Sequence, residues 1–208
     1  MSGDALQPAI GRVPPALRRH PDRLRWNRRY RGEPPTFDAH PLAQAAVAAG
    51  LPDGPVLELA SGRSGNAVML AKAGRHVLAV DISDVALSQL STEAERCGVS
   101  ANIECVLADT ASYDPGEERF ALVLATYFWD ATAFAAACRA VMPGGLLGWE
   151  ALARPPADEH AHLPWRIAHG ALSARLPARF TVLDEQLIVT GTKRSTRLLA
   201  RAAPAAPV

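Results

Sequence analysis

The stretch Gly54–Ser83, GPVLELASGRSGNAVMLAKAGRHVLAVDIS, predicts a strand, a tight loop, a helix and a second strand. Val56–Leu59 is short and apolar, which is typical of a buried strand, and small residues crowd the turn after it. The helix is expected to end at Gly74, because glycine is the usual residue in the left-handed conformation just after a helix. His76–Val80 is almost wholly apolar, as expected for a parallel strand that is covered on both faces. A parallel β-α-β unit of this kind places a ligand crevice at the carboxyl ends of its strands.

Length and composition predict a globular protein. The 208 residues are 49% apolar, and a formal net charge of +1 gives the molecule no overall electrostatic preference for nucleic acid or membrane. No apolar run reaches the roughly 18 residues that a membrane-spanning helix needs, and the chain does not open with a basic-then-apolar signal segment. The three cysteines, Cys97, Cys105 and Cys138, are dispersed without CxxC spacing, which favours reduced thiols. We therefore expect a cytoplasmic protein.

Composition also predicts how the chain is divided. Residues 1–16 are rich in proline, glycine and alanine without apolar periodicity, and we expect them to be mobile. Residues 17–202 contain no low-complexity linker or internal repeat, so a single domain is expected, in which residues 17–50 form an N-terminal helical cap. Residues 203–208 are a tail rich in proline and alanine, and we expect it to be frayed.

Helices and strands continue to alternate after the opening unit. Further helices are expected from Asp38 or His40 to 49, at 83–97, from Asp130 or Thr132 to 141, and at 164–176. Further strands are expected at 102–107, 120–125, 146–152, 180–189 and 194–202. This alternation predicts an α/β fold with a mostly parallel sheet. A Thr-Gly-Thr-Lys turn separates the last two strands, so these are expected to form an antiparallel hairpin at the end of the sheet.

An arginine-rich helix is predicted before this sheet. The run RRHPDRLRWNRRYRG holds seven arginines, with Pro21 suited to the first turn of a helix and Gly32 to its end. Trp26 and Tyr30 are four residues apart and share one helix face. Three interpretations stay open: a lid that lays aromatic rings over a small-molecule site, a helix that simply docks its rings on the core, or a basic patch for RNA.

The loop after the first strand admits two ligands. It contains Ala60-x-Gly62-x-x-Gly65, one glycine short of the dinucleotide fingerprint, and Asp81 is placed to bind a ribose diol in either case. Glu58 precedes the loop by two residues, where a carboxylate would repel a pyrophosphate but suits an ammonium group. Asp109 follows the third strand and can accept a hydrogen bond from an exocyclic amine. A carboxylate at each of these places favours S-adenosylmethionine, which has an amino acid, a ribose and an adenine but no phosphate.

Four stretches of this sequence together resemble a known family. They are Trp26-x-x-Arg29-Tyr30, Glu58-x-Ala60-x-Gly62 with Asn66 after it, Ala79-Val80-Asp81-Ile82-Ser83, and Met142-Pro143-Gly144-Gly145. In their order and spacing they resemble the class I S-adenosylmethionine-dependent methyltransferases. The subgroup of greatest similarity is that of small bacterial enzymes similar to tellurite-resistance and thiopurine methyltransferases.

The resemblance implies a Rossmann-like, seven-stranded methyltransferase sheet that is mostly parallel, with an antiparallel C-terminal hairpin and helices on both faces. It also implies which residues bind the cofactor: Glu58 and the backbone of Ala60–Gly62 at the methionine moiety, Asp81 with Ile82 at the ribose, and Asp109 with Thr110 at the adenine. The family usually has three glycines where this chain has Ala60, Gly62 and Ser64. Alanine at the first place is expected to be a mild change, and Ser64 the larger departure.

Methyl transfer from a sulfonium is an in-line displacement on an activated donor, so the protein mainly aligns the reactants and excludes water. The expected acceptor is a small molecule: a thiol, a chalcogen anion or a small acid. Its pocket is expected between the N-terminal helix, the end of the fourth strand and the loop 153–165. The residues expected to line it are Trp26, Arg29, Tyr30, Tyr127, Phe128 and Trp129. An oxygen or nitrogen acceptor would need a base, for which Asp130, Tyr127 or a loop histidine is available.

Structural alternatives apply to each of these sites. Asp81 and Asp109 are also suited to cap helices or turns at strand ends, and Glu58 to pair with an N-terminal arginine. His160 and His162 form an HxH pair without a third ligand in view, so no metal site is expected. For the whole chain, an NAD(P)-binding oxidoreductase and a catalytically silent cofactor-binding protein are the alternative functions.

Overall fold

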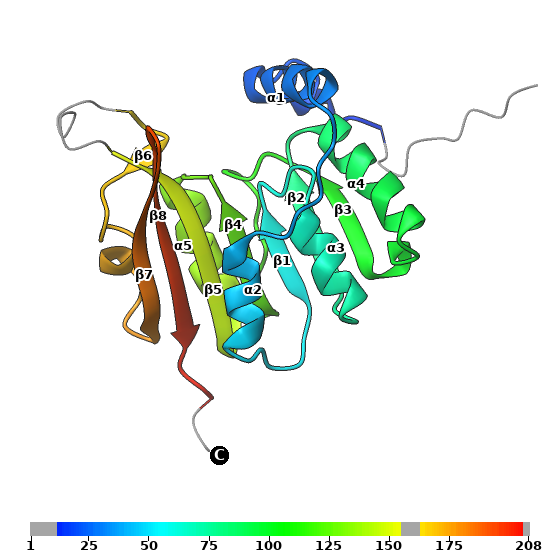
Figure 1. Ribbon diagram of the computed structural model, residues 1–208. Coiled ribbons are helices and arrows are strands. Elements are labelled where there is room, and N and C mark those ends of the chain that lie inside the picture. Colours follow the sequence, from blue (N-terminus) through cyan, green and yellow to red (C-terminus); the bar gives the residue numbers. More distant parts are fainter. Residues whose placement is uncertain (1–11, 155–162, 206–208) are drawn as a thin grey trace, which may run out of the picture.

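The computed structural model describes residues 12–154 and 163–205, and its centre is a mixed sheet with helices on both faces (Figure 1). The strand order is β3-β2-β1-β4-β5-β8-β7, and a short eighth strand, β6, pairs with β5. The helices are α1 (Pro21–Gly32), α2 (Pro41–Ala48), α3 (Gly65–Lys72), α4 (Asp84–Arg96) and α5 (Ala131–Ala140). The strands are β1 (Val56–Leu59), β2 (Val77–Asp81), β3 (Ile103–Leu107), β4 (Phe120–Thr126), β5 (Val141–Ala153), β6 (Arg166–Ile167), β7 (Phe180–Thr190) and β8 (Lys193–Ala202).

Strands β1 to β5 are parallel, as the alternation of helices and strands predicts. Leu59, the last residue of β1, pairs with Val80 on one side and Ala125 on the other. The carboxyl ends of β1, β2 and β4 are therefore level, and the loops that follow them meet at one edge of the sheet. Parallel α/β sheets bind ligands at such an edge.

Each face of the sheet has its own apolar core. On one face α2, α3 and α4 pack against the sheet, with Leu42, Leu70 and Leu90 buried among them. On the other face α5 supplies Phe134, whose ring packs edge-on against Trp149 of β5 with 5.1 Å between the ring centroids. Because both faces are covered, the central strand β4 is apolar and buried from Phe120 to Ala125.

The C-terminal hairpin is confirmed. β8 pairs antiparallel with β5 on one side and with β7 on the other, so β7 forms the edge of the sheet. The sheet therefore has the predicted parallel body and antiparallel end, with eight strands rather than seven because β6 adds one short pairing to Leu152 and Ala153.

The predicted helix at 164–176 is wrong. This segment contains β6 and a short 3₁₀ turn at Ser173–Arg175 in its place. Ile167 and Leu172 are both buried, although residues five apart lie on different sides of a helix and could not both face one core. Gly170 between them has φ +83°, a left-handed conformation that interrupts a helix.

Other element boundaries differ by a few residues, with one larger exception. β5 begins at Val141 rather than at 146, so it includes Pro143-Gly144-Gly145, and its pairing with β4 shifts register between Phe120 and Leu122. Residues 1–11 of the expected mobile segment, His160 and His162, and residues 206–208 of the expected tail lie outside the described residues.

The connection from α1 to α2 crosses the turn between β1 and α3 (Figure 1). Gly65, the first residue of α3, is required there because a Cβ at this position would collide with the backbone carbonyl of Asp38. The close approach brings His40, which begins α2, within hydrogen-bonding distance of Asn66: its backbone N–H donates to Asn66 Oδ1 at 2.6 Å. The N-terminal cap is thus attached to the loop that forms the crevice.

We predict that Gly65→Ala lowers the free energy of unfolding by about 1–3 kcal/mol, because the added methyl overpacks a contact between two backbones. Gly32→Ala is the matched control, since Gly32 is exposed at the end of α1 and its added Cβ would meet nothing within 4 Å. Urea denaturation of both variants measures the difference. Equal stabilities would mean that residues 37 and 38 do not lie against α3.

Candidate active site

The loop after β1 is organised by a buried carboxylate. Glu58 is 1% exposed, and both of its oxygens accept hydrogen bonds from the first residues of α3 and its cap. Ser64 Oγ donates to Glu58 Oε2, and Asn66 Nδ2 donates to Glu58 Oε1 at 2.8 Å. Ser64 also caps α3 by accepting from the backbone N–H of Ala67 at 2.8 Å. Glu58 therefore fixes the turn from β1 into α3 and does not pair with an N-terminal arginine.

Burial changes the protonation of Glu58. Removal from water raises the pKa of this carboxyl to about 7, against the opposing effect of the Ser64 and Asn66 hydrogen bonds. The nearby Asp81 adds a smaller increase in the pKa of Glu58 by charge repulsion. A carboxyl in this state titrates near neutral pH, although its oxygens already have partners.

Asp81 closes the crevice from the end of β2. Its Oδ2 accepts from the backbone N–H of Gly62 at 2.7 Å, and its Oδ1 accepts from the backbone N–H of Ser83 at 2.7 Å. Burial raises the pKa of Asp81 to about 6, and its hydrogen bonds to backbone N–H groups oppose this increase. The carboxylate thus joins the loop after β1 to the N-terminus of α4.

The backbone conformation makes Ala60, and not Ser64 as expected, the larger departure from the glycine pattern. Ser64 has φ −85°, which any residue adopts, and its side chain is used as a cap. Ala60 has φ +49°, in the left-handed region that favours glycine. Gly62 has φ +56°, and a Cβ there would overlap the Tyr30 hydroxyl. The alanine is therefore the strained substitution, and the serine is not.

The remaining predicted cofactor residues lie at neighbouring strand ends. Ile82 is half-buried directly after Asp81, and Thr110 is buried beyond the end of β3. Asp109 is half-buried, and its Oδ1 accepts from the backbone N–H of Ala111 at 3.2 Å, so it also organises its own turn. The backbone N–H of Ala108 donates to the carbonyl of Asp81 at 3.1 Å, which holds the two strand ends together.

Helix α1 lies across the end of the sheet beside α4 (Figure 1). Asn27 Nδ2 donates to Asp84 Oδ1 at 2.8 Å, Ser83 Oγ donates to Asn27 Oδ1 at 2.6 Å, and Arg23 pairs with Asp84 at 2.7 Å. These contacts attach the middle of α1 to the N-terminus of α4. Asn27 was not among the predicted residues, because a single asparagine in an arginine-rich run gives no signal in the sequence.

Tyr30 of α1 reaches the loop after β1. Trp26 and Tyr30 stack with 5.9 Å between their ring centroids, and the Tyr30 hydroxyl lies against Gly62. Burial, then the charge of Asp81, raises the pKa of Tyr30. Arg63 of the loop lies 4.9 Å from the Tyr30 ring centroid, and Arg29 is exposed and paired with Glu33 at 3.1 Å. Tyr30 is thus brought to the loop after β1, whereas Arg29 lies 5.4 Å from the Trp26 ring centroid and has no contact with that loop among those described.

Some residues after β4 pack against the core, and one is exposed. Phe128 and Trp129 pack against the core on the α5 face, at 6.1 Å from Trp149 and 5.7 Å from Phe134 between ring centroids. Asp130 accepts from the backbone N–H of Ala133 at 2.8 Å and is the N-cap of α5. Tyr127 is 47% exposed, so it is the residue of this segment that is open to a ligand.

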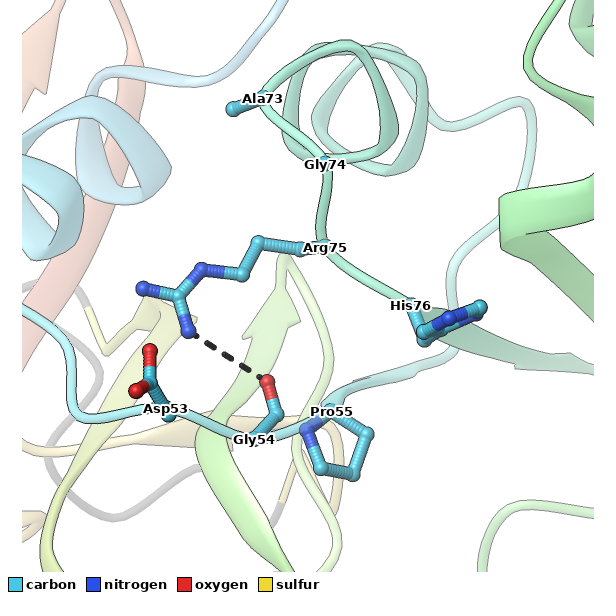
Figure 2. Close-up of a pocket in the computed structure, with 7 residues that line it drawn as sticks. All are labelled: Asp53, Gly54, Pro55, Ala73, Gly74, Arg75 and His76. Atoms are coloured by element: carbon cyan, nitrogen blue, oxygen red, sulfur yellow. Dashed lines mark hydrogen bonds between the residues drawn. The ribbon is translucent and has the colours of Figure 1, made fainter.

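A hollow at the opposite end of the sheet is not part of this site. Figure 2 shows that it is lined by Asp53, Gly54, Pro55, Ala73, Gly74, Arg75 and His76, which precede β1 and β2 or follow α3. Arg75 extends across it and donates to the carbonyls of Pro52 at 2.6 Å and Gly54 at 3.5 Å. Its guanidinium therefore ties two loops together, at the amino ends of the strands and away from the crevice.

Two kinds of feature are absent from residues 12–154 and 163–205. In this part of the chain no three histidine, cysteine or acidic side chains gather as a metal site would require. No helix in it is both long and apolar enough to cross a membrane. Cys97, Cys105 and Cys138 are free thiols, and burial raises the pKa of Cys105 to about 11 and that of Cys138 to about 12.

The comparisons with known proteins agree with this geometry. Residues 56–145, from the start of β1 into β5, match a family model described as a methyltransferase domain. The chain has a methyltransferase fold. The matched segment contains Glu58, Ala60, Gly62, Asp81 and Asp109, and with them the loop, both buried carboxylates and the third strand end.

The individual proteins that match this chain either cover only part of it or share few identical residues with it. A release factor glutamine methyltransferase of Cereibacter sphaeroides is 34% identical over 107 residues, which make up 50% of this chain and 38% of that protein. The chain thus spans well under half the length of this curated relative. TehB from Haemophilus influenzae has a similar structure, with a TM-score of 0.66 and 15% identity over 85% of this chain and 67% of that one.

A geranyl diphosphate C-methyltransferase from Streptomyces coelicolor A3(2) also has a similar structure. Its TM-score is 0.62 at 14% identity, and the match covers 77% of this chain and 76% of that one. That protein was solved in complex with Mg²⁺, geranyl diphosphate and S-adenosyl-L-homocysteine. At these identities the likeness shows the fold.

We predict that Ala60→Gly raises the free energy of unfolding by about 0.5–1 kcal/mol, because it removes the strain of a left-handed alanine while adding some entropy to the unfolded chain. Ala45→Gly, at an exposed position inside α2, is expected to lower it by about 0.5–1 kcal/mol. Thermal unfolding of both variants checks the opposite signs. Destabilisation by Ala60→Gly would show that the turn does not need a positive φ there.

The state of Glu58 predicts a pH-dependent stability. Its folded pKa of about 7 lies above its ordinary value of 4.5, so its contribution is complete below pH 4.5 and is lost as the pH rises through 7. Relative to Glu58→Gln, the free energy of unfolding of the wild type should therefore fall by about 1–3 kcal/mol over that range. Urea denaturation at several pH values measures this difference.

Glu95→Gln is the control for that experiment, because Glu95 is exposed on α4 and its replacement should leave the pH dependence as it is in the wild type. A constant difference between wild type and Glu58→Gln from pH 4.5 to 7 would contradict a raised pKa.

Proposed function

We propose that this chain is an S-adenosylmethionine-dependent methyltransferase that acts on a small molecule. Its catalytic unit is residues 17–202, with residues 17–50 as the cap over the crevice. The observation that supports this most directly is the buried Asp81 at the end of β2, joined to Gly62 at 2.7 Å inside the segment that matches a methyltransferase domain. Glu58 holds the loop after β1 through Ser64 and Asn66, and Asp81 and Asp109 follow the next two strands, where a ligand with a ribose and an adenine would need acceptors.

We assign the cofactor contacts in the order of the strands. The backbone of Ala60–Gly62 faces the methionine moiety, Asp81 and Ile82 the ribose, and Asp109 and Thr110 the adenine. Glu58 acts through Ser64 and Asn66, which donate hydrogen bonds to its two oxygens, and so positions the loop. The S-adenosylhomocysteine found in a protein of similar structure is consistent with this choice of cofactor.

The reaction is an in-line displacement. With S-adenosylmethionine bound, an acceptor atom in its deprotonated form would bond to the methyl carbon as the carbon–sulfur bond breaks, and the electron pair of that bond would go to sulfur, leaving S-adenosylhomocysteine. Alignment and exclusion of water supply up to about 7–11 kcal/mol in favourable cases. In this chain α1 would exclude water through Tyr30, because its hydroxyl lies against Gly62 and its ring against Arg63, while Asn27 attaches the helix to α4.

The subgroup and the acceptor are further steps of the same proposal. The structural similarity to TehB covers 85% of this chain at 15% identity. It is consistent with membership in the subgroup of small bacterial methyltransferases that the sequence motifs resemble. A thiol, a chalcogen anion and a small acid are the acceptor classes to be compared. We expect no nucleic-acid substrate, because the net charge is +1 and the arginines of α1 are partly used in contacts within the chain.

An NAD(P)-linked oxidoreductase is not favoured. The repulsion between Glu58 and a pyrophosphate is a weaker argument than the sequence suggests, because Ser64 and Asn66 separate this carboxylate from the crevice. The stronger argument is the match of residues 56–145 to a methyltransferase domain, in place of a dinucleotide-binding one.

Calorimetry with S-adenosylhomocysteine and with NAD tests the proposal. We expect the first ligand to bind and the second not to bind. Asp81→Ala should weaken S-adenosylhomocysteine binding at least tenfold, because it removes both the ribose acceptor and the anchor of Gly62. Asp53→Ala, in the hollow at the other end of the sheet, is the control and should leave the affinity unchanged. Binding of NAD alone would overturn the proposal, and an unchanged affinity of Asp81→Ala would show that the ribose contact is misplaced.

A further inference from the structure

A positively charged cluster lies at the carboxyl ends of β4 and β5. We call it the basic cluster; its members are His40, Tyr127, Glu150, Lys193 and Arg197. Thr126, the last residue of β4, pairs with Glu150 of β5, and β4 pairs on its other side with β1. The backbone N–H of His40 donates to Asn66, the second residue of α3, at 2.6 Å. The basic cluster is therefore a neighbour of the loop after β1, to which we assign the cofactor.

Glu150 is the buried centre of the basic cluster. It is completely buried, and both carboxylate oxygens have partners from β8: Ser195 Oγ donates to Oε1 at 2.6 Å, and Arg197 Nε donates to Oε2 at 2.6 Å. A carboxylate in a buried strand costs free energy unless it is paired in this way. The site predictions did not include Glu150, although a carboxylate between Trp149 and Ala151 of a buried strand was the available signal.

Arg197 has donors left over after this pairing. In the described part of the chain its Nε is the nitrogen that has a hydrogen-bond acceptor, and 17% of its side chain is exposed. A guanidinium has two further nitrogens in the same plane, and this planar fork matches the two oxygens of a carboxylate. The buried Glu150 thus fixes the plane of a guanidinium whose Nη atoms can bind a second carboxylate.

Lys193 adds a second positive charge on the same face of the sheet. It lies four residues before Arg197 in β8, and side chains an even number of residues apart in a strand point to the same face. Lys193 is exposed, and its ammonium lies 3.7 Å from the centroid of the Tyr127 ring. Within residues 12–154 and 163–205 no ion pair joins it to a carboxylate. The ring thus holds an ammonium that has no anionic partner in these residues.

Tyr127 lies between Lys193 and His40 in an unusual backbone conformation. Its φ is +56°, in a region that is strained for an aromatic residue and is often found at functional sites. The edge of the His40 ring meets the Tyr127 ring at 5.5 Å between centroids. Because 47% of Tyr127 is exposed, part of its ring is an apolar surface open to a ligand beside the Lys193 ammonium.

His40 connects the two ends of the basic cluster without adding a charge. Its Nε2 lies 3.4 Å from Glu150 Oε2. Burial lowers the pKa of His40; Glu150 opposes this effect, and the positive charges of Arg197 and Lys193 lower the pKa further. The imidazole is therefore neutral, and the basic cluster has two cations but one carboxylate. An anionic ligand would balance this excess of positive charge.

We propose that Lys193 and Arg197 bind a carboxylate group of the methyl acceptor, which makes the acceptor a small organic acid. The two cations hold the acid group, and the exposed ring of Tyr127 packs against the organic part of the molecule. A neutral thiol has no group for the cations, and an inorganic chalcogen anion has no organic part for the ring. The inference rests on the proposed methyltransferase function and narrows its acceptor class.

Binding of acids and their amides to the complex with S-adenosylhomocysteine tests this. The probes are benzoate, phenylacetate and 3-phenylpropionate, each compared with its primary amide, which has nearly the same shape and no charge. We expect the saturated complex to bind at least one acid more tightly than its amide by about tenfold or more, measured by calorimetry. Lys193→Met keeps the length of the side chain without its charge. It should reduce this preference by about fivefold or more and leave the affinity for S-adenosylhomocysteine within about twofold of the wild type.

Two further variants serve as controls. Lys72→Met removes the only other lysine of the chain, which is exposed on α3, and should preserve the preference. Lys193→Arg restores the positive charge and should preserve it as well. A melting temperature close to that of the wild type will establish that Lys193→Met is folded, as expected for an exposed side chain.

The outcomes separate this inference from the proposed function. If S-adenosylhomocysteine binds but no acid is preferred over its amide, or if Lys193→Met keeps the full preference, the inference is overturned and the methyltransferase proposal stands. Binding of selenite more tightly than every acid would also overturn the inference, in favour of an inorganic anion. If S-adenosylhomocysteine does not bind, both are overturned.

Discussion

The hydrogen bonds that Glu58 accepts from Ser64 and Asn66 are the interaction on which the rest of the site depends. They turn the chain from β1 directly into α3 and leave the Asn66 carbonyl oxygen to accept from His40, so the same carboxylate sets where α2 begins. Gly65 allows this because its missing side chain lets the residues before His40 pass against the turn. A buried carboxylate costs free energy unless it is satisfied, and the partners that satisfy Glu58 are those that shape the crevice.

Two buried carboxylates, Asp81 and Glu150, organise different parts of the carboxyl end of the sheet. Asp81 joins backbone N–H groups of two loops, so the cofactor half of the site is built mainly from main-chain atoms and small residues. Glu150 joins side chains from β8 and from the N-cap of α2, so this part of the site is built from side chains. The segment that matches the family model, residues 56–145, contains Asp81 and ends before Glu150.

The fold could be predicted wherever one local signal decided the structure. The apolar runs located β1, β2 and β4, and the cap residues Ser83 and Asp130 located α4 and α5. The helix predicted at 164–176 is wrong because its buried residues, Ile167 and Leu172, are placed by the core and not by helical periodicity. The strain at Ala60 was not predicted, for a related reason. Residue type alone suggested a mild change, and the positive φ is a property of the folded turn.

Site residues were predictable where the chemistry of one loop was enough, and missed where two distant segments combine. Glu58 and Asp81 follow from their places at strand ends, but Asn27 acquires its role only when α1 lies on α4, and Glu150 only when β8 pairs with β5. Tyr127 shows the same limit from the other side. Its position after β4 suggests a pocket residue, whereas the groups that contact its ring come from two distant segments, His40 before α2 and Lys193 of β8. Specificity in this fold therefore depends on pairings across the sheet that no single motif contains.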